Sequence, residues 1–267
     1  MRRTLAAGVA VALLSVCAFA PAWGEVVEKE VEYKSGEVTL KGLLAYDAAL
    51  SSTRPGVLVV HEWWGHDEHG RNSARKLAKD GFVALALDMY GEGKQAHHPD
   101  AAGKMANEIG SNWKLMKARF DAAREYLNQQ KNVDPNRTAA IGYCFGGYVV
   151  LQMARAGEPL RGVVSFHGDL STHTPAESGK VKADVLVLNG AADPFVPQSQ
   201  LDAFEKEMDA AGVRYKVVSY PGAKHGFTNP KATENGKKFN LPLEYQPQAD
   251  QQSWNEAIAF LRKVTEK

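Results

Sequence analysis

The chain has 267 residues, of which 44% are hydrophobic and 24% are charged, as in an ordinary globular protein. At this length one large α/β domain is favoured over two smaller ones. The formal net charge of +1 shows no basic or acidic surplus, which argues against a nucleic-acid partner and against an acidic surface partner.

The N-terminal segment has the pattern of a secretory signal peptide. A basic start is followed by an uncharged, mostly apolar stretch from Thr4 to Gly24, with small residues near its end. We expect cleavage after Gly24. The chain then divides into a signal peptide, residues 1–24, and a single domain, residues 25–267.

This cleavage predicts a periplasmic or secreted protein with no stable membrane association. An uncleaved membrane anchor is the alternative, because the apolar stretch is long enough to span a bilayer. The alanine-rich composition and Pro21 favour cleavage over anchoring. Cleavage after Ala20 is less favoured, since it would leave Pro21 as the next residue.

The cysteines sharpen the question of function. Removal of the signal peptide takes away Cys17 and leaves Cys144 as the only thiol, so no internal disulfide can form. Disulfides persist outside the cytoplasm, and a lone thiol there is a liability unless it is buried or useful.

Alternating apolar and polar residues predict an antiparallel strand pair over 26–35 and 38–47. The continuous apolar runs that follow, 56–61 and 82–88, are typical of strands buried on both faces. Between them, residues 71–81 predict a helix that ends at a glycine.

The second half repeats this alternation of strands and helices. Further strands are predicted at 137–144, 162–168, 184–190 and 214–220, and further helices at 112–130, 145–157, 200–212 and 253–264. The pattern indicates an α/β fold with a mostly parallel central sheet, helices on both faces and an antiparallel N-terminal strand pair. Residues 229–250 show no clear periodicity and are expected to form a functional or mobile loop.

A cluster of glycines surrounds Cys144 in the stretch Gly142-Tyr-Cys-Phe-Gly146-Gly147, between a predicted strand and a predicted helix. This is the context of a nucleophile elbow, a strained turn that lifts its central side chain above the sheet. The glycines are needed where backbone segments approach too closely for a β-carbon, and the amides at the start of the helix favour a thiolate. A buried, inert cysteine is the alternative interpretation.

A cysteine nucleophile needs a base and a group that orients the base. Asp193 follows the buried strand 184–190, and His225 follows the last predicted strand in a loop with glycines, the order expected of an elbow hydrolase. Asp169 also follows a strand, but one strand too early. The histidine spacings match no zinc signature, so we predict no metal and no cofactor.

The loop after strand 56–61 is expected to complete the site. The backbone N–H groups of Phe145 and Trp63 are predicted to form an oxyanion hole. Glu62 is a carboxylate close to the thiol, and it would be costly there unless it accepted a hydrogen bond from the thiol or faced solvent. A solvated loop glutamate is the alternative.

The motifs together resemble the dienelactone hydrolase family (carboxymethylenebutenolidases) of α/β-hydrolases over nearly all of residues 25–267. The resemblance rests on "HEWWG", "ALDMYG", "IGYCFGG", "GAADPFVP", "HGF" and "WNEAIAFL". It implies a Cys–His–Asp triad of Cys144, His225 and Asp193. It also implies that Glu62 engages the resting thiol and releases it when substrate arrives.

One departure concerns the arginines with which members of this family bind the carboxylate of dienelactone. Glu92 stands where the first cation is expected, and the residues from Gly226 to Asn229 include no arginine. Lys94 and Lys224 are the nearby cations. The resemblance therefore implies the hydrolase chemistry without dienelactone as the substrate.

We therefore expect a hydrolase that cleaves small-molecule carboxylic esters or lactones through a thioester. Trp64, Tyr90 and Phe227 are predicted to line its pocket, which is expected to be shaped by loops 91–112, 171–180 and 229–248. A redox-responsive thiol protein and a non-catalytic binding module on the same fold are the alternatives. The sequence carries no signal of oligomeric state.

Overall fold

A computed structural model describes residues 24–49 and 51–266 of the protein. The predicted signal peptide therefore lies outside the described residues, apart from Gly24. Among the helices that are described, none is both long and apolar enough to cross a membrane.

One eight-stranded sheet forms the centre of the molecule, with the strand order β1-β2-β4-β3-β5-β6-β7-β8. β1 pairs antiparallel with β2 and β2 antiparallel with β4, and every other pairing is parallel. The predicted α/β fold with its antiparallel N-terminal strand pair is confirmed. The strands are β1 (Val26–Ser35), β2 (Val38–Asp47), β3 (Arg54–Val60), β4 (Val83–Leu87), β5 (Val133–Tyr143), β6 (Gly162–Phe166), β7 (Asp184–Gly190) and β8 (Tyr215–Tyr220).

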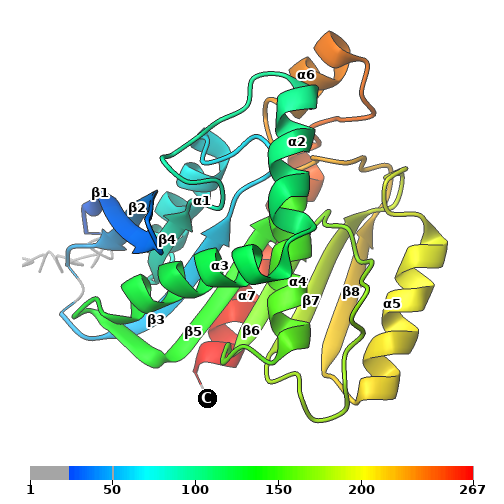
Figure 1. The fold of residues 1–267 in the computed structure, drawn as a ribbon. Coiled ribbons are helices and arrows are strands. Elements are labelled where there is room, and N and C mark those ends of the chain that lie inside the picture. The colour runs from blue at the N-terminus through cyan, green and yellow to red at the C-terminus, as the bar shows by residue number, and fades with distance from the viewer. Residues whose placement is uncertain (1–23, 50, 267) are drawn as a thin grey trace, which may run out of the picture.

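Helices cover both faces of this sheet (Figure 1). α3, α4 and α5 lie on one face, whereas α1 and α7 lie on the other. The helices are α1 (Glu68–Lys79), α2 (Pro99–Gly110), α3 (Trp113–Asn128), α4 (Phe145–Ala156), α5 (Gln198–Ala211), α6 (Ala232–Phe239) and α7 (Pro247–Thr265).

The alternation of side chains in β3 explains why two hydrophobic layers form. Leu58 and Val60 pack in the layer under α3 and α4, and Val57 and Val59 pack in the layer under α1 and α7. All four side chains are fully buried, because a parallel strand covered on both faces has no solvent side.

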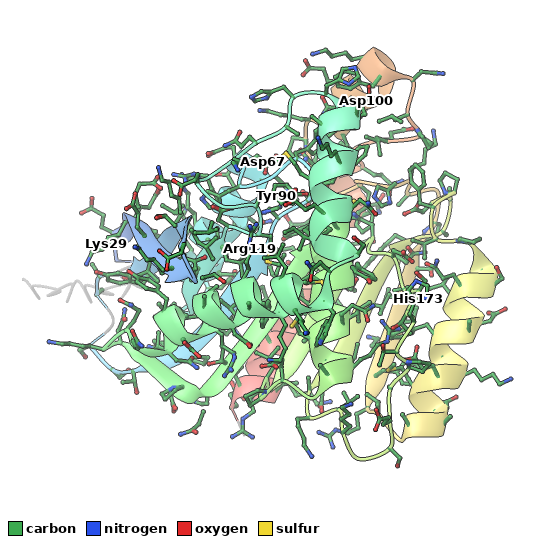
Figure 2. The ribbon with its side chains drawn as sticks, viewed as in Figure 1. Lys29, Asp67, Tyr90, Asp100, Arg119 and His173 are labelled. Atoms are coloured by element: carbon green, nitrogen blue, oxygen red, sulfur yellow. The ribbon has the colours of Figure 1, made fainter. Side chains whose placement is uncertain are left out.

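Two helices were not predicted, α2 within the expected loop 91–112 and α6 within 229–248. Each buries only two residues, Ala102 and Ile109 in α2 and Ala232 and Gly236 in α6, so packing against the sheet accounts for little of either sequence. α2 begins with Pro99 after an N-cap at His98, whose ring accepts the Asp100 N–H. It extends away from the sheet, with Asp100 at its outer end (Figure 2).

Candidate active site

Cys144 occupies a sharp turn between the end of β5 and the start of α4. Its φ of 52° lies in the left-handed region that residues with a side chain rarely adopt. The backbone N–H of Cys144 donates to the Phe166 carbonyl at 3.0 Å, which ties the turn to β6. Such strain persists only where the surroundings enforce it, and it is common at active sites.

The glycines around Cys144 have the steric role expected of them. A β-carbon at Gly142 would overlap the carbonyl oxygen of Gly146, and a β-carbon at Gly146 would overlap that of Val60. Both overlaps involve backbone atoms that cannot rotate away. Glycine at these two positions is therefore a condition for the turn itself.

Three side chains that are far apart in the sequence form a hydrogen-bonded row at this turn. The Nδ1 atom of His225 lies 2.8 Å from Oδ2 of Asp193, and its Nε2 atom lies 3.1 Å from Sγ of Cys144. An ionised carboxylate can only accept, so Nδ1 carries the proton and Nε2 faces the thiol. Asp193 is further fixed because its Oδ1 accepts the N–H of Phe195 at 2.8 Å.

His225 is almost fully buried, and its neighbours determine its charge. Burial lowers the pKa of His225, but the adjacent Cys144 and the hydrogen-bonded Asp193 outweigh burial and raise the pKa to about 10. The ring of Phe195 packs edge-on against the imidazole at 5.0 Å. The arrangement can take a proton from a thiol and later return it to a leaving group.

The loop that carries His225 is held by two buried histidines, a feature that the sequence analysis missed. The Nε2 atom of His167 lies 2.9 Å from Oγ1 of Thr228, and the Nε2 atom of His69 lies 3.1 Å from the Thr228 carbonyl oxygen. Burial lowers the pKa of His69 to about 4 and that of His167 well below its usual range. Both rings are therefore neutral at neutral pH, and they hold the loop through their hydrogen bonds to Thr228.

Glu62 is buried beside the site, with 4% of its surface exposed. Its Oε2 accepts a hydrogen bond from Nδ2 of Asn229, and the thiol of Cys144 faces His225 instead. Burial, with a smaller contribution from Asp67, raises the pKa of Glu62 to about 7. Asn229 lies four residues after His225. In the sequence it was considered only as one of the positions where an arginine is absent, and its hydrogen bond to Glu62 was not predicted.

The two backbone amides predicted to form the oxyanion hole belong to Phe145 and Trp63, which both lie at the cavity beside Cys144. Phe145 is the first residue of α4, so its N–H has no partner within the helix. In the described part of the chain, the N–H of Trp63 likewise donates to no protein group. Both residues line the same cavity as Cys144.

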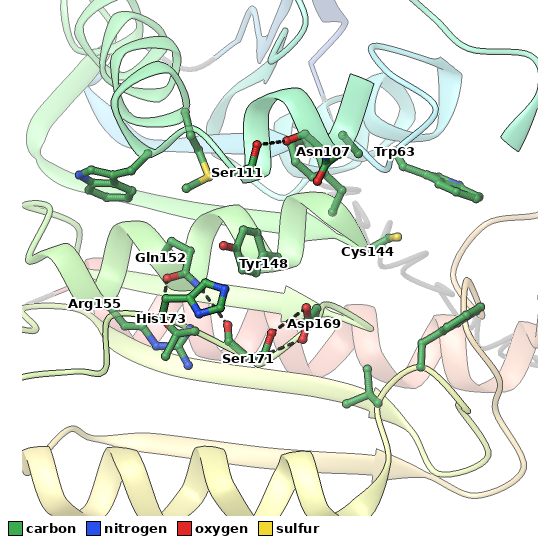
Figure 3. A pocket seen from close by; sticks show the side chains of 18 of the residues that line it. Trp63, Asn107, Ser111, Cys144, Tyr148, Gln152, Arg155, Asp169, Ser171 and His173 are labelled. Atoms are coloured by element: carbon green, nitrogen blue, oxygen red, sulfur yellow. Dashed lines mark hydrogen bonds between the residues drawn. The ribbon is translucent and has the colours of Figure 1, made fainter. Parts of the chain in front are cut away.

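The cavity has a volume of about 1250 Å³, and Cys144 and His225 both line it. Its other walls come from α2, α3, α4, the segment 169–174 and the residues around Leu241 and Leu243. The three predicted loops thus do contribute to it, although part of their length is helical. In Figure 3, Tyr148 and Gln152 extend from α4 into the space that begins at Cys144.

The three side chains predicted to line this pocket lie behind its wall instead, which corrects that prediction. Trp64 packs against Trp63 at 4.9 Å, and Phe227 is fully buried. Tyr90 lies inside the molecule (Figure 2) and donates its hydroxyl hydrogen to the Trp63 carbonyl at 3.0 Å. Tyr90 thus holds the loop at Trp63, and all three side chains add apolar bulk to the core.

The nearby lysines do not replace the missing arginines. Lys224 forms an ion pair with Glu244 at 2.6 Å, and neither Lys224 nor Lys94 lines the cavity. Among the described residues, no group of three or more histidine, cysteine or acidic side chains is arranged to hold a metal ion.

Several known proteins are similar to this chain in sequence and in fold. The model of the "Dienelactone hydrolase family" matches residues 40–265. "Protein usf" of Aquifex pyrophilus is 30% identical over 238 residues, which cover 87% of this chain and 97% of that protein. A "Putative carboxymethylenebutenolidase" of Aquifex aeolicus is 28% identical, with coverages of 87% and 96%.

Among solved structures, a dienelactone hydrolase-like promiscuous phosphotriesterase from metagenomic libraries has a TM-score of 0.84 at 32% identity. The match covers 90% of this chain and 99% of that one. The sequence match and the shared fold agree with each other over almost the whole described chain. The chain therefore belongs to the dienelactone hydrolase family, and it is a hydrolase of carboxylic esters or lactones.

Proposed function

We propose that this hydrolase cleaves its ester or lactone through a thioester on Cys144, with His225 as general base and acid and Asp193 as its orienting group. The single observation that carries the proposal is the hydrogen-bonded row from Asp193 through His225 to the thiol, at the wall of a large cavity. A redox thiol would need no such row.

In the first half-reaction Nε2 of His225 takes the proton of the Cys144 thiol, Sγ attacks the carbonyl carbon, and the amides of Phe145 and Trp63 stabilise the oxyanion. The ester C–O bond breaks, and the departing alkoxide takes the proton from Nε2 of His225. In the second half-reaction His225 accepts a proton from water, which attacks the thioester. The C–S bond breaks, the acid is released and the proton returns to the thiol. A lactone follows the same steps with its alcohol still attached to the acyl group.

We also propose that Glu62 modulates the thiol. Family resemblance implies that this carboxyl engages the resting thiol, whereas here it is hydrogen-bonded to Asn229 and the thiol faces His225. The arrangement described here then corresponds to the released thiol, ready for attack.

Trapping the acyl-enzyme tests the covalent mechanism. With p-nitrophenyl acetate quenched in acid within milliseconds, we expect the peptide containing Cys144 to gain one acetyl group that hydroxylamine removes. Cys144→Ala should show no acetylated peptide. Turnover with the acetyl group on another residue, or with no covalent species and an unchanged rate in Cys144→Ala, would contradict the mechanism.

We propose that the protein is exported and that its signal peptide is removed. In a host with a general secretion pathway, we expect the periplasmic or secreted form to begin at Glu25 by N-terminal sequencing. Gly24→Trp should keep the precursor intact and membrane-bound, because the cleavage site needs a small residue. An intact N-terminus in the membrane fraction for the unmodified chain would instead indicate a retained anchor.

A further inference from the structure

The cavity is larger than a small ester needs. Its volume of about 1250 Å³ exceeds the roughly 300–1,000 Å³ typical of small-molecule pockets, yet the reacting groups occupy only one end. The remaining volume is available to a part of the substrate that does not react. The walls of that part indicate its chemistry.

One wall is a single face of α4. Tyr148, Gln152 and Ala156 follow Cys144 at intervals of four residues, so they lie in a row along the helix, and all three line the cavity. At a rise of about 1.5 Å per residue, the row from Cys144 to Ala156 is about 18 Å long. We call this space the α4 groove; Figure 3 shows it beginning at Cys144 and continuing past Tyr148 and Gln152.

The wall contributed by α2 and α3 is mainly apolar. It includes Ala106, Gly110, Trp113 and Met116, and its polar members are Asn107, Ser111 and Lys117. Trp113 has 42% of its surface exposed, which is unusual for so large an apolar side chain in the described part of the chain. It lies one helical turn from Lys117, which pairs with Glu158 just beyond the end of α4, so the indole belongs to the far part of the groove.

The cations of the α4 groove are already neutralised. Lys117 pairs with Asp121 at 2.6 Å and also with Glu158. The side chain of Arg155 is bound at both Nε and Nη2 by Glu207 at 2.8 Å.

The polar wall adds no positive charge. Lys180 pairs with Glu177 at 2.9 Å. Asp169 accepts only from the backbone N–H and the hydroxyl of Ser171. Each lysine and arginine that lines the groove thus pairs with an acidic side chain, although the buried Nη1 atom of Arg155 has no hydrogen-bond partner in the described part of the chain. Asp169 has no cationic partner among the described residues, so the groove carries no net positive charge to attract an anionic group.

We propose that the α4 groove binds the acyl chain of the substrate, and that this chain is a neutral, extended hydrocarbon of about eight to twelve carbons. The inference rests on the proposed function. The alcohol must leave on the side of His225, which protonates it, so the acyl part extends the other way, along α4. With carbon–carbon bonds of about 1.5 Å, an extended chain advances about 1.3 Å per carbon, and a twelve-carbon chain fits within the 18 Å row.

Two matched glycine substitutions in α2 test the groove. Gly110 lines it, and a β-carbon there would meet Tyr148 at 3.9 Å with no clash, so Gly110→Leu places an isobutyl group across the groove. Gly103 lies in the same helix, outside the cavity and with open space around it, so Gly103→Leu is the control. Both changes raise helix propensity, and both variants should fold.

The readout is kcat/KM for p-nitrophenyl decanoate divided by that for the acetate, below the critical micelle concentration. We expect decanoate to be favoured by about tenfold or more in the unmodified protein, because each buried methylene adds to binding. Gly110→Leu should lower this ratio by about tenfold, whereas Gly103→Leu should leave it within about twofold. Trp113→Ala should lower it in the same direction as Gly110→Leu.

Charge and direction are tested with two further substrates. The p-nitrophenyl monoester of decanedioic acid, which carries a carboxylate at the far end, should react at least about tenfold more slowly than the decanoate. Decyl acetate, with the long chain on the alcohol, should show no gain over ethyl acetate. A gain with decyl acetate, or a faster charged monoester, would overturn the assignment of a neutral acyl chain.

The same measurements distinguish the acyl-chain groove from the thioester chemistry. Cys144-dependent turnover of acetate, with a ratio that neither favours decanoate nor changes in Gly110→Leu, would overturn the groove and leave the thioester chemistry intact. Absence of any Cys144-dependent turnover or acylation, at every chain length, would overturn both.

Discussion

Replacing Cys144 by alanine is expected to lower kcat/KM for an aryl ester by about 10⁴-fold or more, since the acyl group then has no nucleophile to receive it. His225→Gln should cost a similar factor, because the thiol loses its proton acceptor at 3.1 Å. The double variant should be no slower than either single variant, as expected for residues that act in one step. Initial rates with p-nitrophenyl acetate measure all three.

Asp193→Asn tests whether the rate depends on the orientation of the His225 ring, because the ring itself is kept. An amide N–H facing Nδ1 of His225 would move the ring proton to Nε2, which faces the thiol, so we expect a loss of about 10²- to 10⁴-fold. Asp202→Asn, an exposed change on α5, is the matched control and should leave the rate unchanged. Equal rates for the two aspartate variants would remove Asp193 from the mechanism.

Glu62→Gln is expected to change how stability depends on pH. The pKa of Glu62 is raised by burial from its ordinary value of 4.5 to about 7, so the folded state holds its proton more tightly than the unfolded state. Its favourable contribution is complete below about pH 4.5 and is lost as pH rises through 7. The loss amounts to about 3 kcal/mol in the unfolding free energy.

Glutamine is uncharged at every pH and can still accept the hydrogen bond from Asn229. The unfolding free energy of Glu62→Gln relative to that of the unmodified protein should therefore be about 3 kcal/mol more favourable at pH 9 than at pH 5. Urea unfolding at each pH measures this difference. Asn229→Ala is the comparison that removes the partner and keeps the titrating group. A stability difference between Glu62→Gln and the unmodified protein that is the same at both pH values would show that Glu62 does not titrate in this range.

The elements of the sheet could be predicted because their burial leaves a strong pattern in the sequence. β3 is covered on both faces, so its sequence is a continuous apolar run. In β1 apolar and polar residues alternate, because one face of the strand is exposed to solvent. The positions of Asp193 and His225 at strand ends were predictable for the same reason. Chain order along a parallel sheet fixes the edge at which those ends meet.

The pocket could not be predicted in this way. α2 buries only two side chains and lies between a glycine-containing turn and a serine, so its sequence was assigned to a loop, yet it supplies part of the cavity wall. Trp64 and Phe227 are aromatic, like many pocket residues, but only tertiary packing decides which side of a wall a ring occupies. The bond between Glu62 and Asn229 joins residues 167 positions apart, and nothing local in the sequence indicates it.

The position of α2 has a consequence for how this hydrolase can diversify. α2 packs mainly against the neighbouring helices α3 and α4, while the strained turn at Cys144 is locked into the sheet by backbone contacts. Changes in α2 can therefore alter what fits above the reacting atoms without disturbing the turn. Substrate range and catalytic rate can therefore change separately, because the cavity wall and the nucleophile turn belong to different parts of the fold.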